Sequence, residues 1–408
     1  MAEPRSSRSP ARAAVGEVCA WIDAQVSSLR AEDVPLIEAG GRVAAADVAA
    51  GFDLPPFDRA AVDGIAVRAE DTVGASPYSP SLLRWVAASD ELPVGGAAQL
   101  NAGAPLPRGA DAVIALHLVG REAGGAAAIT EPVAAASGTE PRGCQAVAGN
   151  TLVAAGRLLR AAELGLLASA GWERVAVVRR PLVRCVIAGA MLETARSPSR
   201  AQVYEASGPA LRAVVERDGG RIVEAAAVAR DRASLRDALL RPGADIILVV
   251  GGTGPGADDE AAAALAEAGE LVIDGVALRH ADSAGLGRAG GVPVMLLPGS
   301  PAACLLAYEV LAGRAIRRLG GRNGAMPFPT RTMTMARKVV SEISMAEVRP
   351  VRCATAGSVE PVPPITEIGL MALAGADGFL LIPEGSEGYR QGAAVSVYLY
   401  EGYDCAQP

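Results

Sequence analysis

The residues best suited to chemistry form a glycine-rich loop after an apolar run. The run Ile246 to Val250 breaks into Gly251-Gly252-Thr253-Gly254-Pro255-Gly256-Ala257-Asp258-Asp259, and an alanine-rich stretch follows. Glycine lets backbone N–H groups approach an anion, and a following helix N-terminus adds partial positive charge. The loop lacks the Lys-Ser/Thr of a P-loop and the spacing of a dinucleotide fingerprint. It therefore predicts either a phosphate or oxyanion site or a plain strand-to-helix turn.

Three further motifs occupy positions typical of loops. They are Pro-Pro-Phe-Asp-Arg-Ala-Ala-Val-Asp-Gly at 55–64, Ala-Gly-Ala-Pro-Leu-Pro at 102–107 and Leu-Pro-Gly-Ser-Pro at 297–301. Each motif alone is consistent with a tight turn, because Pro, Gly, Asp and Ser dominate turns. Only their order along the chain, together with the glycine loop, gives them a functional meaning.

Strands alternate with helices from 181 to about 320, and this pattern must position the glycine loop. We expect strands at 183–188, 222–228, 246–250 and 292–297, and helices at 207–217, at 233–240, after Asp258 and from Ala302. Such alternation predicts a parallel sheet with helical crossovers, whose ligands bind beyond the carboxyl ends of the strands. The glycine loop lies at one of these ends.

The remaining chain divides into three other regions. Helices are expected at 13–29 and 161–169, after a frayed polar tail of about a dozen residues. The region between these two helices has short extended segments separated by Pro and Gly, which predicts a β-rich insertion. Short strands near the end of the chain predict a small β-barrel or sandwich. The predicted domains are a discontinuous helical domain (7–46 and 143–178), an inserted β-rich domain (47–142), an α/β domain (179–326) and a C-terminal β-barrel-like domain (327–408).

Composition excludes several classes of protein. The 408 residues carry a net charge of −7 and no dense basic tract, which argues against nucleic acid as the main partner. Apolar runs are shorter than a membrane span and no signal peptide is present, so we expect a cytoplasmic protein without membrane contact. The six cysteines lack a Cys-x-x-Cys pair and are expected to be reduced packing residues. Because the chain has only two histidines, a histidine-rich metal site is excluded, and any metal would be a hard cation held by carboxylates. Mg²⁺ is the first candidate.

Taken in order, the motifs resemble the molybdopterin molybdenumtransferase family of molybdenum cofactor biosynthesis. The resemblance runs from about 13 to 400 and includes the tail motif Gly-Phe-Leu-Leu-Ile-Pro-Glu-Gly at 378–385. It implies a multidomain α/β fold with a molybdopterin-binding parallel-sheet domain. It also implies a transferase that inserts molybdate into adenylylated molybdopterin with release of AMP, and a homodimer whose site joins the α/β domain of one subunit to the inserted domain of the other.

The resemblance also implies roles for particular residues. Asp259 and Glu205 would be the catalytic carboxylates and the ligands of Mg²⁺; otherwise Asp259 is a helix cap and Glu205 an exposed acid at a helix start. The substrate-binding positions implied are Asp58, Asp63, Gly64, Arg142, Gly251, Gly252, Thr253, Gly254, Arg279, Pro298, Gly299, Ser300 and Pro301. Partner proteins would be molybdoenzymes or other proteins of the cofactor pathway.

Several positions depart from the family's pattern. Ala102 replaces a threonine, 188–192 replaces a Ser-Thr-Gly-Asp-Glu loop, and Met371-Ala372 replaces two serines. The segment Arg279-His280-Ala281-Asp282-Ser283 replaces Lys-Pro-Gly-Lys-Pro, so that Asp282 adds a negative charge. Losing one oxyanion donor costs about 3 kcal/mol of transition-state stabilisation. The alternatives are therefore a non-catalytic dimeric scaffold that binds a pterin, nucleotide or partner enzyme, and an enzyme in which His280 and Asp282 build a site for a changed substrate.

Overall fold

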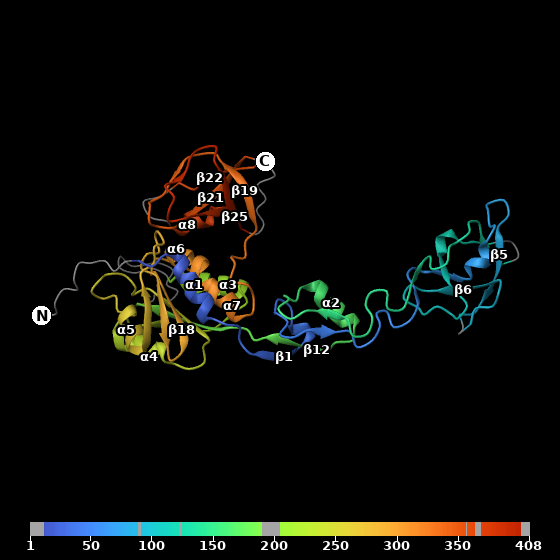
Figure 1. Cartoon of the computed structure of the whole chain (residues 1–408), viewed down its shortest axis with the longest axis horizontal. Coiled ribbons are helices and arrows are strands. Elements are labelled where there is room, and N and C mark those ends of the chain that lie inside the picture. Colours follow the sequence, from blue (N-terminus) through green and yellow to red (C-terminus); the bar gives the residue numbers. More distant parts are fainter. Residues whose placement is uncertain are drawn as a thin grey trace, which may run out of the picture. The chain divides into compact units, whose positions relative to one another are not determined.

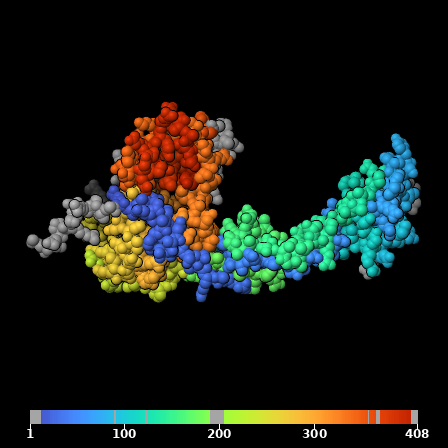
Figure 2. Space-filling view, in the orientation of Figure 1, coloured from blue at the N-terminus to red at the C-terminus, as the bar shows by residue number. Residues whose placement is uncertain are grey.

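The fold is taken from a computed structural model that describes residues 12–88, 91–121, 125–189, 205–355, 357–363 and 369–400. The chain forms two compact units (Figures 1 and 2). Unit 1 comprises 1–32, 41–43 and 178–408, and unit 2 comprises 33–40 and 44–177. The multidomain α/β fold class is confirmed, whereas the boundaries of the four predicted domains stay predictions.

A six-stranded sheet in the order β14-β13-β15-β18-β17-β16 organises the α/β part of unit 1. Its strands are β13 (Leu182–Ala188), β14 (Arg221–Val228), β15 (Ile246–Val250), β16 (Gly269–Asp274), β17 (Gly285–Ala289) and β18 (Val292–Leu297). The first four strands in this order are parallel. Every residue of β15 is buried, as its unbroken apolar run indicates for a strand covered on both faces.

Helices cover both faces of this sheet (Figure 1). They are α1 (Val15–Gln25), α3 (Ser207–Arg217), α4 (Arg232–Leu239), α5 (Ala261–Ala268), α6 (Pro301–Ala307), a π-helical turn (Tyr308–Ala312) and α7 (Gly313–Leu319). One core packs α1, α3 and the 301–319 helix against one face of the sheet. A second core packs α4 and α5 against the other face.

The four predicted strands are parallel as expected, and a hairpin that was not predicted adds two antiparallel strands at one edge. Strand β17 pairs antiparallel with both β18 and β16. Small residues permit this close hairpin, because a Cβ on Gly287 would lie 1.9 Å from the carbonyl oxygen of Glu270. The carboxyl edge of the four parallel strands is unchanged by this edge hairpin, so the predicted position of the glycine loop holds.

A closed five-stranded barrel ends unit 1, in the order β19-β22-β21-β23-β25. Its elements are β19 (Thr330–Met335), β21 (Glu347–Thr355), β22 (Ser358–Pro361), α8 (Leu370–Ala374), β23 (Gly378–Ile382) and β25 (Ala394–Leu399), with the side pair β20 (Val339–Val340) and β24 (Gly388–Tyr389). Phe328, in the preceding linker, lies edge-on to Phe379 and Tyr400, with both ring centroids 5.4 Å away. This aromatic cluster anchors the start of the barrel.

Unit 2 contains a second six-stranded sheet, in the order β7-β4-β6-β5-β9-β8. Its strands are β4 (Gly64–Val67), β5 (Ser81–Val86), β6 (Gly96–Leu100), β7 (Ala112–Ala115), β8 (Gly120–Arg121) and β9 (Ala127–Ile129). The rest of unit 2 holds α2 (Ala161–Ser169), the 3₁₀ turns η1 (Leu36–Glu38), η2 (Ala69–Thr72) and η3 (Leu116–Leu118), and the pairs β2 (Val48–Ala49) with β11 (Thr151–Val153) and β3 (Arg59–Ala60) with β10 (Thr139–Glu140). Strands β1 (Ala31–Pro35) and β12 (Arg174–Val178) pair where the chain passes between the units.

Three of the described cysteines in unit 1 test the expectation that cysteines are reduced packing residues. Burial raises the pKa of the Cys185 and Cys304 thiols to about 12, so both remain protonated packing residues as expected. Cys353 is disulfide-bonded, so the expectation of reduced cysteines is wrong at that position.

Trp21 lies in unit 1 beneath the Arg288 guanidinium, 5.6 Å from the ring centroid, whereas Trp85 and Trp172 lie in unit 2.

Within the described residues, none of the helices combines the length and hydropathy needed to cross a lipid bilayer.

Candidate functional site

The glycine loop and the turn after β18 meet at the carboxyl edge of the parallel strands. The N–H group of Gly251 donates to the carbonyl of Leu297 at 3.0 Å. A Cβ on Gly299 would lie 3.2 Å from the Cα of Gly251, so the two backbones touch where only glycine fits comfortably. Gly251 adopts a left-handed φ of 81°, a conformation that glycine adopts without strain. The two predicted motifs therefore form one structure.

Three consecutive backbone N–H groups, those of Gly252, Thr253 and Gly254, have no hydrogen-bond acceptor among the described residues. Gly252 and Thr253 are nevertheless buried. Buried N–H groups are almost always paired with protein, water or a ligand. Gly251 and Gly252 both have left-handed backbone, and successive N–H groups in turns of this kind are a known type of anion-binding site.

Asp259 closes this loop from within. Its Oδ2 accepts a hydrogen bond from the N–H group of Gly256 at 3.1 Å, and the Asp259 N–H group donates to the carbonyl of Gly256 at 3.1 Å. A Cβ on Gly254 would lie 2.6 Å from the same carboxylate oxygen. Asp259 thus fixes the shape of the loop and is not the cap of α5, whose N-cap residue is Glu260. Its role as a metal ligand stays a prediction.

Glu205 lies at the start of α3 and binds backbone there. Its Oε1 accepts hydrogen bonds from the N–H groups of Ser207 at 2.5 Å and Gly208 at 2.8 Å. A carboxylate at this place satisfies helix N–H groups that have no partner within the helix. The residues just before it, 190–204, lie outside the described ranges and include most of the segment that departs from the family's first loop.

The described carboxylates do not fit a metal held by protein ligands alone. In the ranges that the structure describes, no group of three or more His, Cys, Asp or Glu side chains could hold a metal ion. Asp259 and Glu205 are each engaged with backbone N–H groups instead.

The segment 279–283 joins the glycine loop to the barrel. The hydroxyl oxygens of Ser283 and Thr253 lie 3.1 Å apart, which ties this segment to the loop. The Arg279 guanidinium lies 3.7 Å from the carboxylate of Glu347, a fully buried residue of β21. Glu347 also contacts Arg349 at 2.5 Å. Sequence reasoning missed Glu347 and Arg349, although two charged residues on one face of a barrel strand are a signal for a buried ion pair.

His280 lies between these groups in a left-handed conformation, with a φ of 64°. Burial lowers the pKa of the imidazole below its ordinary value, and the positive charge of Arg279 lowers it further. Asp282 is not the isolated negative charge that the sequence suggests, because Arg12 forms an ion pair with it. The expectation of a frayed tail is therefore wrong at Arg12.

The turn Pro298-Gly299-Ser300-Pro301 starts helix α6. Pro301 is the first helical residue, where its missing N–H group costs nothing. The carbonyl of Ser300 accepts a hydrogen bond from the N–H group of Cys304 at 2.8 Å. Ser300 makes no side-chain cap, and its exposed hydroxyl is available to a ligand.

The other predicted residues lie in unit 2. The carboxylate of Asp58 accepts from the N–H group of Arg142, and that of Asp63 accepts from the N–H group of Ala102, both at 2.7 Å. A Cβ on Gly64 would lie 2.2 Å from the carbonyl oxygen of Ile114, so Gly64 allows β4 to pair with β7. These contacts give the motif 55–64 a structural role. Its role in substrate binding stays a prediction.

Arg142 is exposed, and its Nε donates to Asp53 at 2.6 Å. The N–H group of Ala148 and then Arg142 lower the pKa of the Asp53 carboxyl. Arg142 therefore holds a partner of its own within unit 2.

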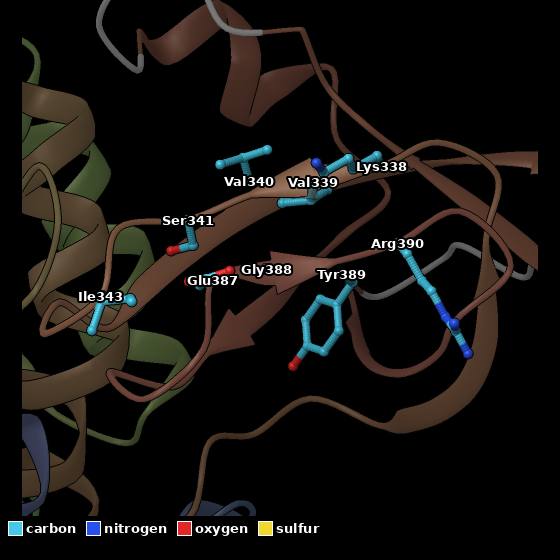
Figure 3. A pocket seen from close by; sticks show the side chains of 9 residues that line it. All are labelled: Lys338, Val339, Val340, Ser341, Ile343, Glu387, Gly388, Tyr389 and Arg390. Carbon is cyan, nitrogen blue, oxygen red and sulfur yellow. The ribbon is translucent and has the colours of Figure 1, made fainter.

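A separate pocket of about 400 Å³ lies in the barrel at the pair β20 and β24 (Figure 3). It is lined by the nine residues that the figure labels, among them Lys338, Ser341, Tyr389 and Arg390. Tyr389 and Arg390 extend to one side of β24, opposite Val340. None of the predicted site residues lines it.

Of the positions that depart from the family, Met371 is 81% exposed and its side chain is not part of the core.

Comparison with known proteins agrees with this geometry. Residues 13–171 match the family described as MoeA N-terminal region (domain I and II), residues 185–318 the probable molybdopterin binding domain, and residues 332–400 the MoeA C-terminal region (domain IV).

Individual proteins match over most of the chain. Molybdopterin molybdenumtransferase 2 of Mycobacterium tuberculosis is 33% identical, with 86% of this chain and 90% of the relative covered. Molybdopterin molybdenumtransferase 1 of the same species is 28% identical, with 94% and 98% covered. Among solved structures, a molybdopterin biosynthesis moeA protein from Pyrococcus horikoshii has a TM-score of 0.77 at 30% identity, covering 96% of this chain and 100% of that one.

The chain belongs to the molybdopterin molybdenumtransferase family, an enzyme family of molybdenum cofactor biosynthesis.

Proposed function

We propose that this chain inserts molybdate into adenylylated molybdopterin and releases AMP. The observation that carries the proposal is the set of three N–H groups at 252–254 that lack an acceptor within the described part of the chain, beside the Pro298-Gly299 turn at the carboxyl edge of the sheet. Such a site suits a phosphate or another oxyanion. The substrates carry both kinds of group, since the pterin is adenylylated and molybdate is itself an oxyanion.

The roles proposed for the residues follow from their contacts. The N–H groups of Gly252, Thr253 and Gly254 bind an oxyanion and stabilise the negative charge that accumulates as the bond to AMP breaks. Water attacks one phosphorus of the link between AMP and the pterin phosphate, the P–O bond to the other phosphate breaks, and both products leave as phosphate monoesters. When the two dithiolene thiols form bonds to molybdenum, their two protons leave with one displaced molybdate oxygen as water. Arg279 adds positive charge near the same edge, and Asp259 preserves the shape of the loop.

Magnesium is proposed to arrive with the substrate's phosphates. Mg²⁺ keeps several waters and is commonly bound by one or two carboxylates together with phosphates. Asp259 and Glu205 are the carboxylates proposed for it. Electron paramagnetic resonance of Mn²⁺, used in place of Mg²⁺, tests this without turnover: we expect tight binding only when AMP is present, and equal binding without AMP would contradict the proposal.

The site is further proposed to be shared within a homodimer, with Asp58, Asp63, Gly64 and Arg142 of one subunit completing the glycine-loop site of the other. The proposed setting is the cytoplasm. Molybdoenzymes or other cofactor-pathway proteins are the proposed recipients of the product.

A second function is favoured by one specific observation, the fact that Asp259 and Glu205 are both occupied by backbone N–H groups. A scaffold that binds the pterin without inserting metal can use Asp259 and Glu205 to hold the backbone in place, and it does not need a free carboxylate to bind a metal. The same fold would then serve as a dimeric binding protein.

Reconstitution of the purified chain with adenylylated molybdopterin, Mg²⁺ and molybdate separates the two functions. We expect molybdate-dependent AMP release that is lost in Asp259→Ala. Asp259→Asn is the matched variant, because its amide oxygen still accepts the Gly256 hydrogen bond but carries no charge. Activity retained in Asp259→Asn assigns Asp259 to loop shape alone; binding of the pterin by the natural chain without AMP release establishes the scaffold.

A further inference from the structure

Arg12 begins a segment that backbone hydrogen bonds hold to the rest of unit 1. The next residue, Ala13, receives a hydrogen bond from the N–H group of Ala277 at 2.8 Å and donates to the carbonyl of Gly275 at 3.1 Å. The N–H group of Val15 donates to Glu384 of the barrel at 2.8 Å. In Figure 2 the segment that begins with these residues (dark blue) lies on the surface of unit 1. Arg12 is therefore a fixed part of unit 1.

The guanidinium of Arg12 makes two contacts among the residues that the structure describes. Nη2 donates to Oδ2 of Asp282, while Nη1 lies 3.9 Å from the sulfur of Met345. The Arg12 and Asp282 side chains are 44% and 43% exposed. Because a guanidinium carries five N–H donors, the pair leaves Arg12 with donors that solvent or a ligand can reach.

Asp282 directly precedes the residue that contacts the glycine loop. Ser283, the residue after Asp282, has its hydroxyl 3.1 Å from that of Thr253 in the glycine loop. An unpaired carboxylate here would repel an anionic ligand. Arg12 offsets the charge of Asp282, whereas Arg279 and Arg349 both contact Glu347 of the neighbouring barrel strand.

We propose that Arg12 is a further substrate-binding cation, which cancels the charge of Asp282 and directs its remaining donors to an anionic group of the ligand held by the glycine loop. The proposal rests on the proposed function, because it needs that loop to bind an oxyanion. It assigns to the N-terminal segment a role that the predicted motifs do not include.

Calorimetric titration of the full chain with AMP tests the proposal through charge. We expect Arg12→Ala to weaken AMP binding about fivefold or more, because the carboxylate of Asp282 is left unopposed. Asp282→Asn should bind AMP at least as tightly as the natural chain. The double variant with both changes should bind more tightly than Arg12→Ala alone, since the repelling carboxylate is gone.

A purely structural role of the ion pair gives the opposite order. Affinity would then follow the integrity of the pair, so that Arg12→Ala, Asp282→Asn and the double variant would weaken binding alike, and that result overturns the proposal. Arg174→Ala is the matched control, because Arg174 forms a comparably exposed pair with Asp33 in unit 2 and should leave AMP binding unchanged.

The AMP-release assay keeps the two failures apart. Unchanged affinity in Arg12→Ala, with AMP release intact in the natural chain, overturns the role of Arg12 alone. If the natural chain neither binds AMP nor releases it, the proposed function fails and the role of Arg12 fails with it.

Discussion

Gly251 and Gly299 bring two backbone segments into contact at the candidate site, and neither position has free space for a side chain. The Cβ of an alanine at 299 would lie 3.2 Å from the Cα of Gly251, and backbone on both sides limits how far either loop can move. The contact keeps the glycine loop and the β18 turn in one arrangement, and with it the N–H groups of residues 252–254.

Gly299→Ala should therefore lower the free energy of unfolding by about 1–3 kcal/mol, the usual cost of overpacking, and weaken AMP binding. Gly16→Ala is the control, because a Cβ at this position of α1 meets nothing within 4 Å and should stabilise by up to about 1 kcal/mol. Urea unfolding measures both. A Gly299→Ala protein with natural stability and affinity would show that the loops have room to separate.

His280 should make stability depend on pH. Its folded-state pKa is lowered, so the unfolded chain takes up a proton first as pH falls below the ordinary value near 6.5. The stability that His280 contributes is complete above that pH and is lost progressively as pH falls toward the lowered pKa. Unfolding at about pH 7.5 and about pH 5.5 should show a smaller loss in His280→Asn, which tolerates the left-handed backbone. Equal losses would contradict this assignment.

The helix from 301 to 319 is interrupted by a π-helical turn at 308–312, and a buried charge network forms at this turn. Asp218 is fully buried and accepts hydrogen bonds from Arg317 at 2.8 Å and Tyr308 at 3.1 Å. Glu309 pairs with Arg217, which also contacts Asp218. The wider π turn directs two consecutive side chains, 308 and 309, toward α3.

Breaking this network should destabilise unit 1. Asp218→Ala leaves Arg317, only 3% exposed, without its carboxylate, and we expect a loss of about 3–5 kcal/mol. Tyr308→Phe removes one hydroxyl from the same carboxylate and should cost about 1 kcal/mol. Thermal unfolding of the two variants checks the difference; similar midpoints would mean that water replaces Asp218 as a partner.

Local patterns predicted much of the element order. The limits of α2, α3 and β18 coincide with the predicted ranges, because periodicity and punctuation by Gly and Pro determine them locally. The β16–β17 hairpin was missed, since its antiparallel pairing depends on partners across the sheet. Arg12 was missed for the same reason: it lies 270 residues from Asp282 in sequence, and no spacing rule connects them.

At the scale of the whole molecule, the candidate residues are divided between two units. The glycine loop, the 297–301 turn and Arg279 belong to unit 1, whereas Asp58, Asp63, Gly64 and Arg142 belong to unit 2. If one site uses both sets, its residues come either from a single chain or from the two chains of a dimer. The proposed homodimer predicts twice the mass of one chain by light scattering, and a monomer would contradict the shared site.

Mixed dimers give a sharper test of sharing. Asp259→Ala and Asp63→Ala should each be inactive alone, but after exchange of subunits about half of the dimers are mixed and each mixed dimer regains one intact site. We therefore expect recovery to about a quarter of natural AMP release. No recovery, in a preparation shown by mass spectrometry to contain mixed dimers, would place both residues in the site of one subunit.

The division of the three tryptophans between the units gives each unit its own optical signal. Trp21 is alone in unit 1, whereas Trp85 and Trp172 belong to unit 2. In a chain carrying Trp85→Phe and Trp172→Phe, all indole emission comes from Trp21, which lies beneath the Arg288 guanidinium. The emission maximum of Trp21 then reports on the α/β part of unit 1, and unit 2 contributes no indole emission.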